Sequence, residues 1–326
     1  VSRTCSQDDE GTSGERRKGG AVSSRSNAHA PPDHPETTNG GPLKVLEELR
    51  TEELKGMPAP PPESSLRAVL EQLQSDDWGA HFDAINLLRR LVAWGDESGF
   101  DGGILSHLHS INLHLIQYGD SLRSALAKNA VVCFRELFAY FGSKMEADLD
   151  LIVPILIKKA GETNGFISDE ANKALSMMVH SVSENRAISA LLASTSHRNP
   201  AARAKAAAHL AKALEVVGYA RLLHSRELDR VLPVLPTMLS EGLSETRAAA
   251  KQVIAGLTRE ARSSPAESER LDRLLRRNLS DPAYRKLRDS IDSNAEPLLG
   301  LKMNAGPAVA GARKAEGRRS STGGAP

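Results

Sequence analysis

Apolar residues return at spacings of three and four through most of this chain, and that spacing restricts its fold more than any other feature. One example is the series Phe82, Ile85, Leu88, Leu91 and Val92. Such spacing places apolar side chains on one face of a helix. Gly, Asn, Asp, Ser and Pro interrupt the pattern after each stretch of about 10 to 18 residues. Because strand-like alternation is not evident, the pattern predicts an all-α protein.

The interruptions group the predicted helices into pairs, each with a short turn inside it. The expected pairs are 64–74 with 79–94, 103–118 with 121–141, 146–161 with 168–182, 184–194 with 200–217, 227–240 with 244–261, and a less regular sixth, 266–279 with 282–293.

The second helices of these pairs align with one another. Arg123, Ser168, Arg203 and Arg247 fall in one column of the alignment, and His81 fits the same column. The period of about 40 to 47 residues, with two helices in each unit, is typical of HEAT repeats. A helix pair cannot bury its apolar face alone, so neighbouring pairs stack. We therefore predict an α-solenoid of five to six HEAT repeats.

Composition sets the expected boundaries of this solenoid. Residues 63–300 form the predicted domain. Residues 1–62 are rich in Gly, Ser, Pro and charge, with a possible short helix at 43–54, and 301–326 form a basic tail. Both ends contain too few large apolar side chains to offset chain entropy, so we expect them to be disordered. Since the chain begins with Val1 rather than Met, we expect a piece of a longer protein.

Several classes of function are not indicated. Cys5 and Cys133 are the two cysteines, which argues against a disulfide framework or a zinc site. No apolar run reaches the roughly 18 residues of a membrane span, and a formal charge of +1 gives no footprint for nucleic acid. We expect an intracellular protein without metal or cofactor, whose partner is neither nucleic acid nor membrane.

In a solenoid of this kind the turns inside the pairs emerge along one edge. Here those turns contain Trp78, Arg123, Phe166, Arg198 with Asn199, and Arg247. An exposed aromatic residue beside arginines is typical of an interface hot spot. The pattern therefore predicts a protein that binds another protein through these turns and is not an enzyme.

Each of these residues also has a structural interpretation. Trp78 could pack on its own helix pair, and Phe166 could be a core residue. Arg123, Arg203 and Arg247 could form internal ion pairs with the neighbouring unit, whereas Arg198 and Asn199 lie farther out on their turn.

A second kind of function is suggested by Gly119-Asp120-Ser121-Leu122, the string of a family of serine hydrolases. Those enzymes place the serine after a strand and need an Asp-x-x-His partner near the C-terminus. Neither feature is present in the sequence, so we interpret Ser121 as the N-cap of the following helix.

Several motifs resemble the TOG domain, a tubulin-binding module of HEAT repeats. The motifs are Asp77-Trp78, Leu122-Arg123-Ser124, the stretch 158–167 and the stretch 173–179. They are similar to the CLASP and crescerin branch, and most similar to the last TOG domain of the TOG array regulators of axonemal microtubules. The resemblance covers about residues 64–299.

This resemblance implies a function and a set of contact residues. It implies binding to tubulin or microtubules by a monomeric domain of a larger multi-TOG protein, in the cytoplasm and cytoskeleton and in the cilium or axoneme. The implied contact residues are Trp78, Arg123, Phe166, Ser168, Arg198, Asn199, Arg203 and Arg247.

The chain departs from the family pattern at three positions, where Gly79, His81 and Ser168 replace basic residues. Fewer cations imply weaker binding to acidic tubulin. The alternative is a generic HEAT scaffold for a partner other than tubulin.

Overall fold

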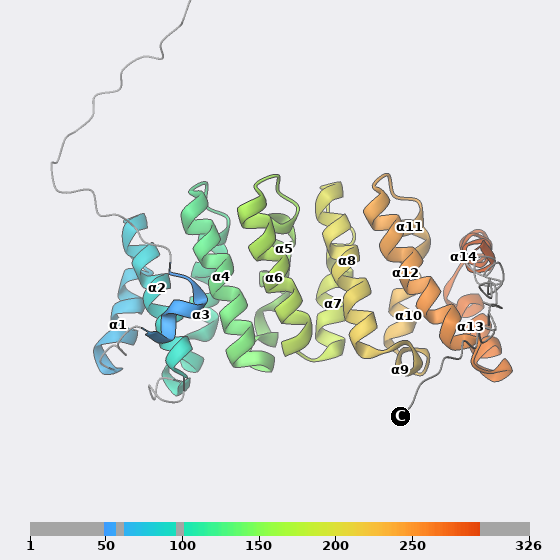
Figure 1. Ribbon diagram of the computed structural model, residues 1–326, viewed down its shortest axis with the longest axis horizontal. Coiled ribbons are helices and arrows are strands. Elements are labelled where there is room, and N and C mark those ends of the chain that lie inside the picture. The colour runs from blue at the N-terminus through green and yellow to red at the C-terminus, as the bar shows by residue number, and fades with distance from the viewer. Residues whose placement is uncertain (1–48, 57–61, 96–100, 294–326) are drawn as a thin grey trace, which may run out of the picture. The chain divides into compact units, whose positions relative to one another are not determined.

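The computed structural model describes residues 49–56, 62–95 and 101–293, which all belong to one compact unit. Within these ranges every regular element is a helix and no strand occurs. The helices stand side by side in chain order (Figure 1). The predicted all-α solenoid is therefore confirmed.

Five long helices form one layer of the solenoid. These second helices of the pairs are α2 (Trp78–Trp94), α4 (Ser124–Phe141), α6 (Gly165–Ser181), α8 (Pro200–Val217) and α12 (Ser244–Ala261). Each packs against the next in this order. Each also packs against the first helix of its own pair, so that one apolar core runs through the stack from Val69 to Ile291.

The first helices of the pairs form the other layer. They are α1 (Pro62–Gln72), α3 (Asp101–Gly119), α5 (Leu149–Ala160), α7 (Glu184–Ser194) and, in the fifth pair, α10 (Glu227–Val231) with α11 (Leu235–Leu239). A 3-10 helix, η3 (Gly142–Asp148), precedes α5, and the short α9 (Tyr219–Leu223) precedes α10. The stack ends with α13 (Pro265–Asn278) and α14 (Asp281–Ser293).

Small residues allow the units to approach closely. Ala202, Ala206 and Ala207 are buried on α8. A Cβ atom added to Gly161 would lie 2.8 Å from the backbone nitrogen of Ala202. Glycine is therefore required where the third turn meets the start of α8.

Several helices have bounds other than those predicted from the sequence. Helices α7, α8 and α12 have the predicted bounds, but the helix expected at 227–240 is divided into α10 and α11 by a turn that contains Pro233. Proline lacks the N–H that a continuous helix would use, which accounts for the break. The third pair was expected to start at Glu146, but this residue belongs to η3.

The boundary at residue 62 requires a correction. Residues 1–62 were expected to be disordered apart from a possible helix at 43–54, yet Thr51–Gly56 forms a 3-10 helix, η1, that packs on α2. Leu54 of η1 is only 1% exposed. Pro62 is already the first residue of α1. The predictions for 1–48, 294–300 and the basic tail 301–326 lie outside the described residues.

Candidate functional site

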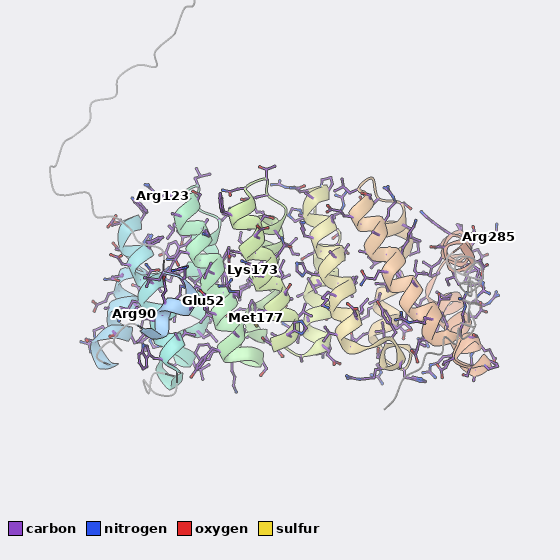
Figure 2. All side chains as sticks on the ribbon, viewed as in Figure 1. Glu52, Arg90, Arg123, Lys173, Met177 and Arg285 are labelled. Atoms are coloured by element: carbon purple, nitrogen blue, oxygen red, sulfur yellow. The ribbon has the colours of Figure 1, made fainter. Side chains whose placement is uncertain are left out.

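The turns inside the helix pairs lie along one edge of the stack, which we call the turn edge. It consists of the residues between α1 and α2, α3 and α4, α5 and α6, α7 and α8, and α11 and α12. The turns before α4, α6 and α12 are visible along the same edge in Figure 1, and Arg123 extends from this edge in Figure 2.

Trp78 and Arg123 come together at the first and second turns. Trp78 is the first residue of α2, and the Asp77 carboxylate caps the helix by accepting hydrogen bonds from the Gly79 and Ala80 backbone nitrogens at 3.1 and 3.2 Å. The indole is partly buried against the core, and the Arg123 guanidinium carbon lies 4.5 Å from its ring centroid. This cation–π contact holds the two side chains as one unit. Trp78 therefore has both a packing role and a surface at the edge.

The predicted alignment of Arg123 is wrong by one helical turn. Arg123 is the residue before α4, whereas Ser168, Arg203 and Arg247 are each the fourth residue of their helices. Ser121 is also not the N-cap of α4. Its hydroxyl instead accepts a hydrogen bond from the Arg123 backbone nitrogen at 3.2 Å, so the turn continues to Arg123 before the helix starts.

Side chains at the fourth helical position fold back onto the turn that precedes them. The Ser168 hydroxyl donates to the Ala160 carbonyl at 2.6 Å, Arg203 Nη1 donates to the His197 carbonyl at 2.9 Å, and Arg247 Nη1 donates to the Glu241 carbonyl at 2.6 Å. His81 Nε2 lies 2.5 Å from the Ser75 carbonyl oxygen. These carbonyls lie at or just beyond the ends of the first helices, where backbone acceptors lack helical partners. The position therefore closes the turn.

Arg203 is also held by an ion pair within the solenoid. Its Nε and Nη2 atoms donate to the two carboxylate oxygens of Glu241 at 2.8 and 2.9 Å. This hydrogen bonding lowers the pKa of the Glu241 carboxyl and raises the pKa of Arg203. The bidentate geometry uses the planar fork of the guanidinium. The internal ion pair considered for Arg203 is confirmed.

Large apolar side chains project from the turn edge. Leu122, before α4, has a relative exposure of 104%, and Phe166, at the start of α6, is 79% exposed. The interpretation of Phe166 as a core residue is therefore wrong. Leu243, in the fifth turn, is 39% exposed. Sequence reasoning did not single out Leu122, because an apolar residue beside a helix start commonly packs on its own helix.

The fourth turn carries the remaining two predicted residues. Arg198 and Asn199 are exposed, as expected from their place on the turn. The Asn199 side chain caps α8 by accepting a hydrogen bond from the Ala201 nitrogen at 2.9 Å. The Arg198 carbonyl accepts a bond from Arg203 at 3.2 Å. Asn199 thus has a structural role, and Arg198 offers its side chain to solvent.

Ser121 lies in the second turn beside Asp120, which pairs with Lys158 on α5. Over the part of the chain that the structure describes, no group of three or more His, Cys, Asp or Glu side chains is arranged to hold a metal ion. None of the helices described is both long and apolar enough to cross a bilayer.

The stacked pairs and the exposed turn edge define a helical-repeat protein whose surface is suited to contacts with other macromolecules. Residues 64–287 match the CLASP N terminal family, and the chain belongs to that family.

Three named proteins are similar to parts of this chain. TOG array regulator of axonemal microtubules protein 1 is 32% identical over 189 residues in Mus musculus and 34% identical over 158 residues in Homo sapiens. These alignments cover 57% and 48% of this chain but only 10% and 8% of the relatives. Crescerin-like protein che-12 of Caenorhabditis elegans is 22% identical over 240 residues, which is 73% of this chain and 18% of that protein.

Solved structures show the same fold. A structure from a study of crescerin as a TOG domain array has a TM-score of 0.51 at 14% identity, with 74% of this chain and 92% of that chain covered. The TOG domain of C. elegans Zyg9 has a TM-score of 0.51 at 14% identity, with 70% and 82% covered. The expected resemblance to TOG domains of the crescerin type is thereby confirmed.

Proposed function

We propose that this chain is a tubulin-binding module that uses its turn edge and contributes to microtubule assembly in cilia as part of a longer protein. The observation that carries the proposal is the row formed by the Trp78–Arg123 pair, Leu122 and Phe166. Family membership supports it, because one relative is named as a regulator of axonemal microtubules and one solved neighbour is described as a crescerin TOG array that regulates microtubules in the primary cilium. The proposed role is binding and not catalysis.

The chemistry of the row agrees with an interface anchor. The indole is already held by a guanidinium, and exposed apolar side chains flank it. A partner that covers this row therefore buries apolar area without ordering many flexible groups. Removing apolar surface from water contributes about 25 cal/mol per Å². Three such side chains can therefore supply several kcal/mol to an interface before the costs of association.

Gel filtration and microtubule pelleting with purified tubulin test this proposal. The variants are Trp78→Glu and Arg123→Ala, and Leu151→Glu is the control because Leu151 is 47% exposed on α5, away from the turn edge. We expect the wild-type chain and Leu151→Glu to bind tubulin, Trp78→Glu to lose at least about 30-fold, and Arg123→Ala to lose about 5-fold.

Because Trp78 is partly buried, circular dichroism must show that its variant remains folded. Arg123 is exposed, so its variant separates a binding defect from a folding defect. If the wild-type chain fails to bind at tens of micromolar tubulin, a scaffold for another partner becomes the better interpretation. Such a partner would be sought with the same edge variants.

A further inference from the structure

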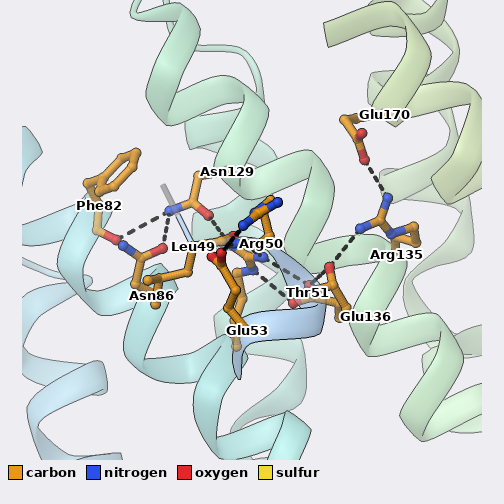
Figure 3. Close-up of polar contacts among 11 residues, drawn as sticks. Leu49, Arg50, Thr51, Glu53, Phe82, Asn86, Asn129, Arg135, Glu136 and Glu170 are labelled. Carbon is orange, nitrogen blue, oxygen red and sulfur yellow. Dashed lines mark hydrogen bonds and ion pairs between the residues drawn. The ribbon is translucent and has the colours of Figure 1, made fainter. Parts of the chain in front are cut away.

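The segment Leu49–Gly56, which we call the brace, lies across the layer of second helices (Figure 3). Leu54 lines an apolar site together with Val92 and Ala93 of α2 and Ala139 and Tyr140 of α4, and is 1% exposed. The brace thus contacts two consecutive units away from the turn edge. It precedes the first repeat in the sequence and belongs to no helix pair.

A buried arginine joins the brace to both helices. Arg89 of α2 is 0% exposed, and its Nε and Nη2 atoms donate to the Glu136 carboxylate of α4 at 2.8 and 3.0 Å. Nη1 donates to Asn129 Oδ1, also on α4, at 2.8 Å, and Nη2 donates to the backbone carbonyl of Leu49 at 2.8 Å. A charge taken out of water needs all of these partners. The carbonyl of Leu49 is one of them.

Thr51 extends these contacts to the third unit. Its hydroxyl donates to Glu136 and accepts a hydrogen bond from Arg135 Nη2 at 2.7 Å. Arg135 in turn pairs with Glu170 on α6. A continuous chain of polar contacts therefore links α2, α4 and α6, with Thr51 in its middle (Figure 3).

The three helices linked in this way begin at the three turns that carry the row. Helix α2 begins with Trp78, α4 follows Arg123, and α6 carries Phe166 in its first turn. Repeats in a solenoid contact only their neighbours, so small rotations between units accumulate along the stack. A segment that bridges adjacent units limits those rotations. A rigid partner that engages all three turns needs them at fixed separations.

We propose that the brace positions the first three turns for simultaneous contact with the partner, so that Thr51 and Leu54 are positioning residues for the turn edge. This inference rests on the proposed function. The brace touches no residue of the row, and it acts through the spacing of α2, α4 and α6.

Affinity for the tubulin dimer, measured on the full chain, tests the inference. Leu54→Asp is expected to detach the brace and weaken binding about 10-fold, and Thr51→Val, which keeps the shape but removes the hydroxyl, about 3-fold. Arg50→Ala is the matched control, because Arg50 is exposed and its side chain contacts Glu53 inside the brace. We expect it to stay within twofold of wild type. Circular dichroism at the assay temperature checks that the variants are equally folded, so that differences in affinity do not reflect differences in folded fraction.

A double-mutant cycle with Phe166→Ser distinguishes positioning from simple stabilisation. If the brace aligns three contacts, removal of Phe166 makes Leu54→Asp less harmful than it is in the wild-type chain. Pulsed EPR between labels at Asp76 and Thr163, in a Cys5→Ser background, should show a broader distance distribution in Leu54→Asp than in Arg50→Ala. Cys133 is fully buried and does not compete for label.

Three outcomes overturn the inference while the proposed function stands: unchanged affinity in folded Leu54→Asp, additive losses in the cycle, or an unchanged distance distribution. Failure of the wild-type chain to bind tubulin would instead remove the proposed function on which the inference rests.

Discussion

The first three turns of the edge and its last two turns use similar residue types in opposite ways. In the first three, Leu122 and Phe166 project into solvent and Arg123 covers the indole of Trp78. In the last two, Arg203 and Arg247 turn inward to backbone carbonyls, and Arg203 also holds Glu241. An arginine in a turn is therefore not in itself a contact residue. The direction of the arginine side chain depends on whether the residue precedes the helix or occupies the fourth position within it.

The difference has a consequence for the chemistry of binding. Cations that are bound to carboxylates and carbonyls contribute little attraction to an external partner. The first three turns offer apolar area, whose contribution depends on burial and not on charge. We expect the first three turns to determine affinity and the last two to determine the stability of the solenoid.

The largest effect is expected from acid on the second half of the stack. Burial, aided by Lys205, lowers the pKa of His209 on α8 to about 4, and its Nε2 lies 3.1 Å from Asn172 Oδ1 of α6. In the folded state the His209 imidazole stays neutral down to about pH 4. In the unfolded state it becomes protonated below about pH 6.5. Stability from this group is therefore present above about pH 6.5 and is lost as the pH falls toward 4, by roughly 3 kcal/mol.

Urea unfolding at several pH values measures this loss. His209→Gln should be less sensitive to acid between pH 6.5 and 4 than the wild-type chain, whereas the exposed His107→Gln should follow wild type. Equal acid sensitivity in the His209→Gln variant would show that other groups control the stability in this range.

The next largest effect is expected on the tubulin affinity of the first three turns. The double variant Leu122→Asp with Phe166→Asp should lose about 100-fold in tubulin affinity, close to 3 kcal/mol, because two exposed apolar anchors become charged. Its melting temperature should remain near that of wild type, since both side chains are exposed. The control is the pair Leu113→Asp with Leu151→Asp, which are 45% and 47% exposed outside the turn edge. Equal losses in both pairs would remove the distinction between the edge and the rest of the surface.

A smaller effect is expected when Arg203 is replaced. Arg203→Ala leaves Glu241 and two turn carbonyls without their donor, so we expect the melting temperature to fall by about 3 °C. Tubulin affinity well below the melting temperature should change less than twofold. The exposed Arg198→Ala provides the control for stability. If Arg203→Ala lowered tubulin affinity more than twofold at a temperature where the variant is folded, Arg203 would belong to the contact residues.

The smallest effect is expected from salt. Raising the salt concentration from about 0.05 to 0.3 M should weaken tubulin binding less than about threefold, because the apolar row is not screened. Fluorescence anisotropy at constant pH provides the measurement. A steep decrease of tubulin affinity with salt would mean that exposed cations such as Arg198 dominate the contact. The last two turns, and not the first three, would then determine affinity.

Part of the candidate site followed directly from the pattern of the sequence. The turns containing Trp78, Arg198 and Asn199 were found because helix periodicity and turn residues act locally. The place of Arg123 was missed by one helical turn, because Leu122 and Leu126 continue the apolar spacing backward past the start of α4. A pattern of apolar residues does not report where hydrogen bonding begins.

The brace shows a second limit. A short helix at 43–54 was considered possible, but Leu54 alone does not reveal that Thr51–Gly56 packs on α2. Arg89 appears in the sequence as an ordinary helical arginine. Its complete burial depends on Glu136, Asn129 and Leu49, which are far from it in the chain.

The sequence by itself determined the helix pairs, their order and the edge at which their turns emerge, because these depend on spacings within a few residues. The tertiary structure decided which turn residues face outward. Leu122 and Phe166 are exposed, whereas Arg247 folds onto its own turn and Arg203 is also held by Glu241 of the next unit. That last partner reaches Arg203 only when the repeats stack.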